Sequence, residues 1–297
     1  MPRRPRTAPP SSGPGRLRGE LVRVLGALDR QIERALEHVP LTPEEVHDLH
    51  RDLRRLASGL TVWGRLLPAD THPEAREVAG RLRRLARLVG RVRDRDVTAS
   101  LLGPISQGSR LRPPPEAWRG FLGQLREDSH TGRELLRAFL RTERQGGLFE
   151  RARGLLATAP RADAGRGLHH ILAEERRRRQ ARVRKAQRKA RRDPTGERLH
   201  RLRIRIRQWR HLASLEGLAR ATANHPPPLS WRRLQERLGR LHDLDVALAT
   251  IPEALAGSVP ALRLREVRRE LRRAVRLTLE RNAARGERAA ATARGAA

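Results

Sequence analysis

Apolar residues recur at helical spacing along most of the chain, in segments separated by clusters of Pro, Gly, Ser and Asn. One stripe, at steps of three and four residues, consists of Val46, Leu49, Leu53, Leu56 and Leu60. A second stripe of identical spacing consists of Leu199, Leu202, Ile206, Trp209 and Ala213. This spacing places each stripe on one side of an α-helix. We find no alternation of apolar and polar residues of the kind that marks a half-buried strand. The sequence therefore predicts an all-α protein.

The breaker clusters divide the chain into segments of helical length. At one start, Thr42 is a capping residue, Pro43 suits the first turn, and Glu44 and Glu45 favour a helix N-terminus. The cluster at 101–116 is rich in Gly and Pro and is predicted to separate two helices. About eight helices are expected, near 16–38, 43–67, 73–100, 116–157, 167–192, 196–222, 230–250 and 260–286.

A short segment of the chain occurs twice. Gly90 to Val97 reads GRVRDRDV and Gly239 to Val246 reads GRLHDLDV, with five identities in eight positions. Each copy lies downstream of a basic helix whose cations are led by a histidine, His47 in the first and His200 in the second. Two copies of a four-helix unit, at 16–157 and 167–286, account for the duplication and the helix count.

The two ends are predicted to lie outside these repeats. Residues 1–15 are basic, contain no acid and lack the apolar core of a signal peptide, so we expect a disordered tail. Residues 287–297 form an Ala/Arg-rich tail, for which the sequence favours neither helix nor disorder.

Net charge narrows the choice of partner. The chain has 297 residues, and 65 Lys and Arg against 33 Asp and Glu give a formal charge of +32. Such an excess of one sign repels itself unless an anionic partner lies against it. The sequence therefore predicts a polyanionic partner.

Composition excludes several other classes. The absence of cysteine excludes disulfides, thiolate metal sites and a cysteine nucleophile, and it fits a cytoplasmic location. No stretch approaches 18 uninterrupted apolar residues, so we expect no membrane span. The sequence leaves the oligomeric state open.

Two predicted helices carry rows of cations beside their apolar stripes. On a helix that turns about 100° per residue, the row on the second of these helices covers an arc of roughly 80°. The row on the first helix covers about the same arc. Guanidinium groups in such a row suit a chain of phosphates, because each planar fork takes two oxygens and stays charged. The first helix contributes His47, His50, Arg51, Arg54 and Arg55, and the second contributes His200, Arg203, Arg207 and Arg210.

The segment 174–192 is dense in Arg and Lys behind two acids. Too many cations surround this helix for all of them to face one ligand. We expect a subset at three- and four-residue steps to face the polyanion, namely Arg178, Arg182, Lys185 and Lys189.

The basic helices resemble those of the CHAD-domain proteins, whose signatures read approximately H-x-x-R-V-x-x-R-R-x-R and H-x-L-R-I-x-x-K/R-x-x-R. The segment from His200 to Arg210 fits the second signature at every basic position. The segment from His47 to Ala57 departs from the first, with His50 where Arg is usual and Arg51 where an aliphatic residue is usual.

The resemblance implies two four-helix bundles related by a pseudo-two-fold axis, which together form one CHAD domain. It also implies that basic residues of both halves line a groove or pore that binds inorganic polyphosphate. No catalysis and no cofactor are expected, and relatives of this kind are often associated with polyphosphate granules.

Two other functions remain open at this point. A nucleic-acid-binding protein is compatible with the charge, although aromatic residues make up only 2% of the chain and offer little base stacking. A metal-dependent phosphohydrolase is suggested by the adjacent pairs His47-Asp48 and His242-Asp243, but Arg93 stands where His242 stands in the other repeat. We therefore expect no metal site.

The acidic residues of the repeated segment have a different expected role. An anion facing polyphosphate would oppose binding, so these carboxylates are expected to pair with arginines on adjacent helices. They are Asp94, Asp96, Asp243 and Asp245.

Overall fold

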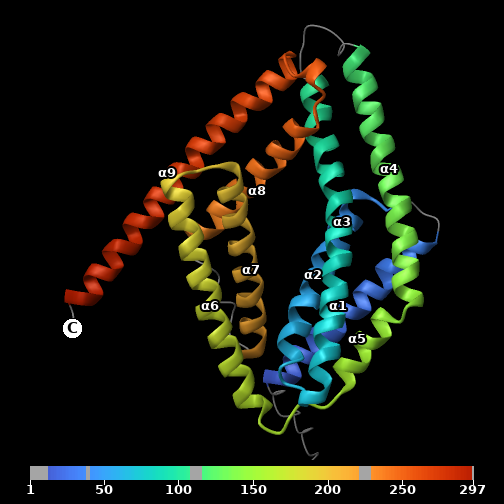
Figure 1. The fold of residues 1–297 in the computed structure, drawn as a ribbon, viewed down its shortest axis with the longest axis vertical. Helices are drawn as coiled ribbons and strands as arrows, with labels where there is room; N and C mark the ends of the chain where they lie inside the picture. Colours follow the sequence, from blue (N-terminus) through green and yellow to red (C-terminus); the bar gives the residue numbers. More distant parts are fainter. Residues whose placement is uncertain (1–12, 38–40, 108–115, 221–228, 296–297) are drawn as a thin grey trace, which may run out of the picture. The chain divides into compact units, whose positions relative to one another are not determined.

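The computed structural model describes residues 13–37, 41–107, 116–220 and 229–295 (Figure 1). Within these ranges every regular element is a helix, which confirms the all-α prediction. None of the described helices carries an apolar stretch that could cross a bilayer.

The helix bounds agree with most of the predicted segments. A capping box starts α2, where the Glu45 N–H donates to Thr42 Oγ1 at 3.2 Å and the Thr42 N–H donates to the Glu45 carboxylate at 2.9 Å. Short 3₁₀ turns lie at Ala69–Thr71 and Glu253–Leu255. The α-helices are α1 (Gly13–Leu36), α2 (Pro43–Trp63), α3 (His72–Gln107), α4 (Glu116–Gln145), α5 (Leu148–Ala157), α6 (Ala164–Arg192), α7 (Gly196–Arg220), α8 (Leu229–Thr250) and α9 (Val259–Gly295).

The single helix predicted at 116–157 is wrong, because it divides into α4 and α5. Gly147 adopts φ +66°, a left-handed conformation that a residue without Cβ takes readily. The chain turns at this glycine, and α5 begins with Leu148, which is fully buried. A glycine pair within an otherwise periodic segment thus marks a real helix end.

Three helices extend further than predicted. Residues 13–15 of the predicted tail belong to α1, and residues 1–12 lie outside the described residues. Although Pro104 is a helix breaker, α3 continues through it to Gln107, and Leu102 is buried against Trp118 of α4. The tail at 287–297 is helical as far as Gly295, as part of α9.

The chain forms two compact units. The first unit comprises 1–89, 136–177 and 211–225, and the second comprises 90–135, 178–210 and 226–297. The chain passes from one unit to the other within α3, α4, α6 and α7. Each unit takes residues from both predicted repeats, so the division into repeats stays a prediction.

In the first unit, α1 packs against α2 and α5. Trp63 of α2 is 1% exposed, and its indole N–H donates to the Leu155 carbonyl of α5 at 2.9 Å. This hydrogen bond satisfies the one polar group of a large buried side chain.

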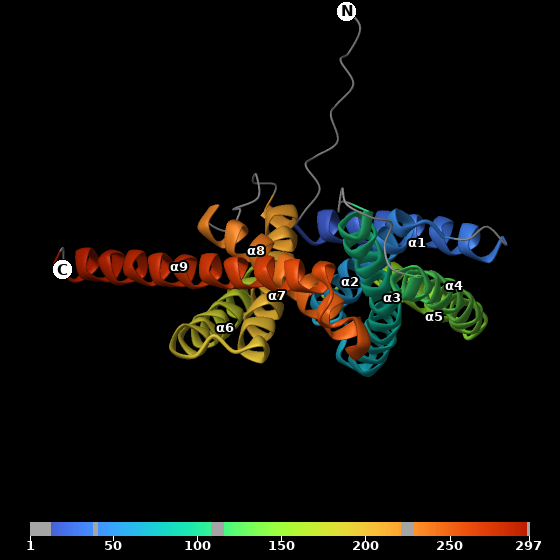
Figure 2. The ribbon, with the colours of Figure 1, turned by 90° about the horizontal axis from the view of Figure 1, so that it is seen from above.

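In the second unit, α8 lies along α9, as both ribbon views show (Figures 1 and 2). Leu199, Leu202 and Ile206 of α7 are buried against Val183 of α6 and Val275 of α9. The predicted apolar stripe of α7 therefore faces a core, which positions its neighbouring row of cations.

Candidate anion-binding site

Three helices of the second unit bring together seven charged or polar side chains, which we call the histidine–arginine cluster. The helices are α3, α7 and α8, and both copies of the repeated segment take part. The members interact electrostatically with one another. They are Arg93, Asp94, His200, Arg203, Arg207, His242 and Asp243.

The packing of α7 against the core determines how far each of its cationic side chains is buried. Because its apolar stripe is buried, the adjoining face lies partly inside the unit. Arg203 is only 9% exposed, and His200 and Arg207 are half-buried. Arg210 donates from Nη1 to Gln235 Oε1 of α8 at 2.7 Å. The predicted row is thus in place, but its members differ in access to solvent.

His200 and His242 form a pair. Their Nδ1 atoms lie 3.3 Å apart and their ring centroids 4.9 Å apart. At this distance a hydrogen bond between the rings has one Nδ1 as the donor and the other as the acceptor. Burial, followed by the charges of Arg203 and Arg207, lowers the pKa of His200. Burial is also the main cause that lowers the pKa of His242, to about 3. The pair is therefore neutral at pH 7.

The remaining charges of the cluster nearly balance. Burial raises the pKa of both Asp94 and Asp243, while the nearby Arg93 opposes that change. Arg93 Nη1 lies 3.1 Å from Asp94 Oδ1. Burial also lowers the pKa of Arg203, and Asp243 partly offsets this. With neutral histidines, three arginines and two carboxylates give 3 − 2 = +1, a net positive and partly buried group that can bind an anion.

Two of the repeated carboxylates pair with arginines on adjacent helices, as expected from the sequence. Asp96 accepts from Arg133 Nη2 and from Ser129 Oγ of α4, both at 2.5 Å. Asp245 forms an ion pair with Arg268 of α9. These contacts hold the repeated segments of α3 and α8 against their neighbours.

Because burial lowers the pKa of His242 in the folded state, we predict that the free energy of unfolding depends on pH. The unfolded chain binds a proton at His242 as the pH falls through about 6.5, whereas the folded chain does so only near 3. Stability is therefore full above pH 6.5 and falls as the pH drops between these values. With a discount for partial exposure, we expect a loss on the order of 1 kcal/mol at about pH 5.

The variant His242→Asn isolates this effect, because its amide can still bond to His200 but does not titrate. Urea unfolding at about pH 7.5 and pH 5 should show a smaller loss of stability in the variant than in the wild type. Equal losses in the two proteins would mean that His242 does not contribute.

The first basic helix, α2, carries cations that are locally compensated. Arg51 Nη1 lies 2.7 Å from Asp48 Oδ1, and Arg51 Nε lies 3.1 Å from Asp52 Oδ1. Arg55 forms an ion pair with Glu20 of α1, a residue that is 2% exposed. His47 is exposed, and His50 and Arg54 are partly exposed. All of these residues belong to the first unit.

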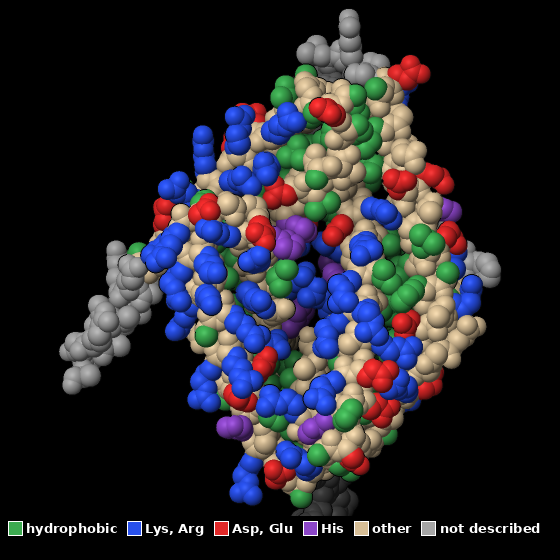
Figure 3. Space-filling view, in the orientation of Figure 1, with side chains coloured by type: hydrophobic (Ala, Val, Ile, Leu, Met, Phe, Trp, Pro, Cys, Tyr) green, Lys and Arg blue, Asp and Glu red, His purple; other side chains and the backbone are tan. Residues whose placement is uncertain are grey.

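The predicted row on α6 is the most accessible of the three. Arg178, Arg182, Lys185 and Lys189 are all exposed, while Val183 and Ala190 face the core. Arg182, Lys185 and Lys189 form no ion pair with a carboxylate of the described residues. In the space-filling view, Lys and Arg side chains gather over α6 and α7 (Figure 3).

The parts of α6 and α7 that belong to the second unit, residues 178–192 and 196–210, form a hairpin. Arg179 Nη1 of α6 donates to the Gln208 carbonyl of α7 at 2.7 Å. The short link at 193–195 joins the two helices. The exposed α6 row and the cluster on α7 therefore belong to one packed element pair.

Sequence reasoning missed two members of the cluster as candidate ligand residues, Arg93 and His242. Asp94 and Asp243 instead interact with arginines of the cluster, among them Arg203 of α7. The signal was the repeated segment itself, since both copies reach the cluster. Helical periodicity assigns a residue to a face, but it does not say which helices meet at that face. Across the described ranges, no three His, Asp or Glu side chains come together in a way that could hold a metal ion.

Comparisons with known proteins place the chain by family and by fold. A search of curated protein sequences gives no significant match. The family model described as CHAD domain matches residues 26–252. A crystal structure of the CHAD domain from the plant Ricinus communis matches with a TM-score of 0.54 and 18% sequence identity, over 91% of this chain and 92% of that chain. At this identity the structural match shows a shared fold.

Proposed function

Because the chain belongs to the CHAD domain family, we propose that it binds inorganic polyphosphate and has no catalytic activity of its own. The cations of α2, α6 and α7 are the proposed contacts, with α2 and α7 as equivalent helices of a duplicated four-helix unit. Polyphosphate granules are then the proposed location of the protein in the cell.

The exposed row on α6 is the observation that carries this proposal. Arg178 and Lys189 are eleven residues apart, which corresponds to about 16 Å along a helix. Four cations spaced at about 4.5 to 6 Å along this line match a ligand that repeats a negative charge along its length. The absence of described carboxylates paired with Arg182, Lys185 and Lys189 leaves their charge available to such a ligand.

The histidine–arginine cluster offers a second type of contact. Arg203 and Arg207 are held at a fixed depth by the buried stripe of α7, so little side-chain entropy remains to be lost on binding. A bound phosphate would also favour a proton on the histidine pair, because an added negative charge raises the pKa of an imidazole.

Nucleic acid is the alternative polyanion. Trp209 and Trp231 contact each other edge to face, with centroids 5.9 Å apart, and pack against the core of the second unit. They are therefore engaged with the protein, while the exposed α6 row contains no aromatic residue on which a base could stack. This contrast favours a phosphate chain over a base-bearing strand.

A competition experiment tests the proposed function. Purified protein is bound to labelled long-chain polyphosphate at about 150 mM salt and titrated with unlabelled polyphosphate or duplex DNA. We expect polyphosphate to compete at least about tenfold better than DNA, with affinity falling steeply as salt rises, since each contact releases counterions. Equal competition would favour a nucleic-acid-binding protein. Release of free phosphate on addition of Mg²⁺ or Mn²⁺ would instead favour a hydrolase.

A further inference from the structure

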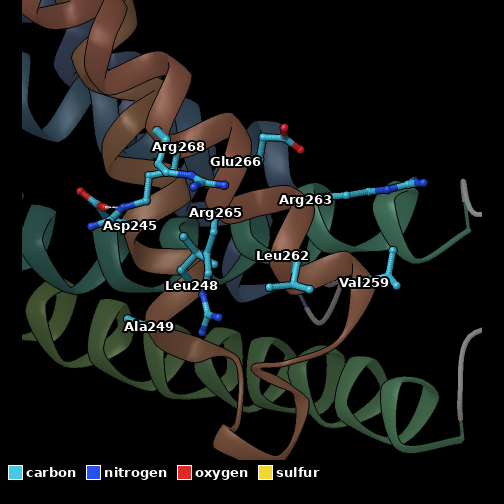
Figure 4. A pocket seen from close by; sticks show the side chains of 10 residues that line it. Asp245, Leu248, Ala249, Val259, Leu262, Arg263, Arg265, Glu266 and Arg268 are labelled. Carbon is cyan, nitrogen blue, oxygen red and sulfur yellow. Dashed lines mark hydrogen bonds and ion pairs between the residues drawn. The ribbon is translucent and has the colours of Figure 1, made fainter.

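A groove lies between the C-terminal part of α8 and the N-terminal part of α9, both in the second unit (Figure 4). The groove is open to solvent and has a volume of about 870 Å³. Leu248 of α8 and Val259 and Leu262 of α9 provide apolar lining, and four arginines of α9 also line it. The groove therefore combines apolar surface with positive charge.

Two of the apolar side chains that line the groove are accessible to solvent. Val259 is 57% exposed and Leu262 is 51% exposed, although both are large apolar side chains. They lie three residues apart, on one side of α9. Polyphosphate has no apolar group, so the proposed function does not account for these residues. Together with the groove beside them, these exposed side chains form a surface from which a binding partner can be inferred.

The charged residues that line the groove indicate that the partner is negatively charged. Arg263, Arg265 and Arg269 line it and form no ion pair with a carboxylate of the described residues. The other charged lining residues are Glu266 and the ion pair of Asp245 with Arg268. Four arginines and two carboxylates give 4 − 2 = +2. Figure 4 shows Leu248, Arg265 and Leu262 among the side chains that line the groove.

We propose that this groove binds an acidic amphipathic helix of a partner protein. Apolar side chains at three- and four-residue steps of such a helix would cover Leu248, Val259 and Leu262. Carboxylates flanking that stripe would pair with the arginines of the groove. A second copy of the chain is a poor occupant, because two chains that each carry a charge of +32 repel each other.

A labelled peptide tests this proposal in the full-length protein. The probe is a helical peptide of about 16 residues with Leu at steps of three and four and Glu on both flanks. Fluorescence anisotropy should show at least about a tenfold loss of affinity in the variant Leu262→Glu. The matched control is Leu277→Glu, because Leu277 lies on the same helix, is 53% exposed and does not line the groove. It should bind the peptide within about twofold of the wild type.

Two altered peptides separate groove binding from general attraction to a basic protein. Replacing Leu by Ser in the probe, or Glu by Lys, should each weaken binding at least about tenfold. Equal binding of the Ser peptide would overturn the proposal, since charge alone would then explain the interaction. A dimer in sedimentation velocity that Leu262→Glu dissociates would also overturn it, by identifying the occupant as a second copy.

This proposal stands independently of polyphosphate binding. Leu262→Glu should leave the affinity for polyphosphate unchanged, because Leu262 is outside the proposed phosphate contacts. Conversely, failure of polyphosphate binding would leave the peptide result intact. The two functions can therefore be tested separately in the same set of variants.

Discussion

Replacing Arg182, Lys185 and Lys189 together by Glu lowers the affinity for polyphosphate at least about a hundredfold at about 150 mM salt. Each of these cations is exposed and has no ion-pair partner among the described carboxylates. A hydrogen bond between charged groups contributes about 1.5 kcal/mol or more, so three lost contacts exceed a hundredfold even when they are only partly formed. Charge reversal adds repulsion between the new carboxylates and the phosphates.

The same helix provides a matched control. Arg177, Arg184 and Arg188 are also exposed cations of α6 and lie about 110° around the helix from the row. Replacing these three by Glu gives the same change of net charge in the same helix. The control should lose less than about tenfold in affinity, through the long-range field alone. Filter binding or anisotropy with labelled polyphosphate measures both variants, and circular dichroism checks that each keeps its helicity. Equal losses in the two variants would remove the row as a specific contact and leave only net charge.

Local sequence patterns predicted the helices well where they were reinforced by packing. The stripe on α7 was read from its spacing, and its residues are buried in a core of the second unit. The start of α2 was read from Thr42 and Glu45, which form the capping box. In both cases the information lies within a few residues of the feature, which makes it accessible without a structure.

Predictions failed where a distant contact or an unusual backbone conformation determines the helix end. Pro104 and the neighbouring glycine predicted a helix end, yet Leu102 is 1% exposed against Trp118, so tertiary packing carries α3 onward. Conversely, Gly147 interrupts a periodic segment by taking a left-handed conformation. A weak local preference is easily outweighed by burial of a large side chain, and only the folded chain shows which one dominates.

The candidate site likewise contains some features that the sequence predicted and others that it did not. Helical periodicity predicts the rows on α6 and α7. The α6 row is exposed, whereas Arg203 of the α7 row is buried, because the two rows lie at different angles from the face that packs against the core. The partners of these rows were not predictable, because Arg93 and His242 reach the cluster from α3 and α8. The compensation of Arg51 and Arg55 on α2 depends in part on Glu20 of another helix. A row of cations in a sequence therefore shows which helix face carries positive charge, but it does not show how much of that charge is compensated by carboxylates.

Removing the Asp96 carboxylate costs about 3 kcal/mol of stability or more. Asp96 is 7% exposed and accepts from Ser129 and from Arg133, whose side chain is 17% exposed. The variant Asp96→Ala leaves the Arg133 charge desolvated and without this partner, and the loss of one member of a buried ion pair is far more costly than the pair itself is worth. Urea unfolding at pH 7 measures the change in free energy.

The repeated segment supplies the control for this prediction. Asp245 occupies the place of Asp96 in the second copy, and its ion pair with Arg268 is more accessible, with side-chain exposures of 28% and 33%. Water can therefore solvate Arg268 when its partner is removed, and Asp245→Ala should cost about 1 kcal/mol or less. A loss of similar size at both positions would contradict this account, because it would mean that sequence equivalence in the repeat, and not burial, sets the energy of the pair. The unequal result would show that two copies of one motif have taken different structural roles, with the α3 copy fixing α4 and the α8 copy only weakly restraining α9.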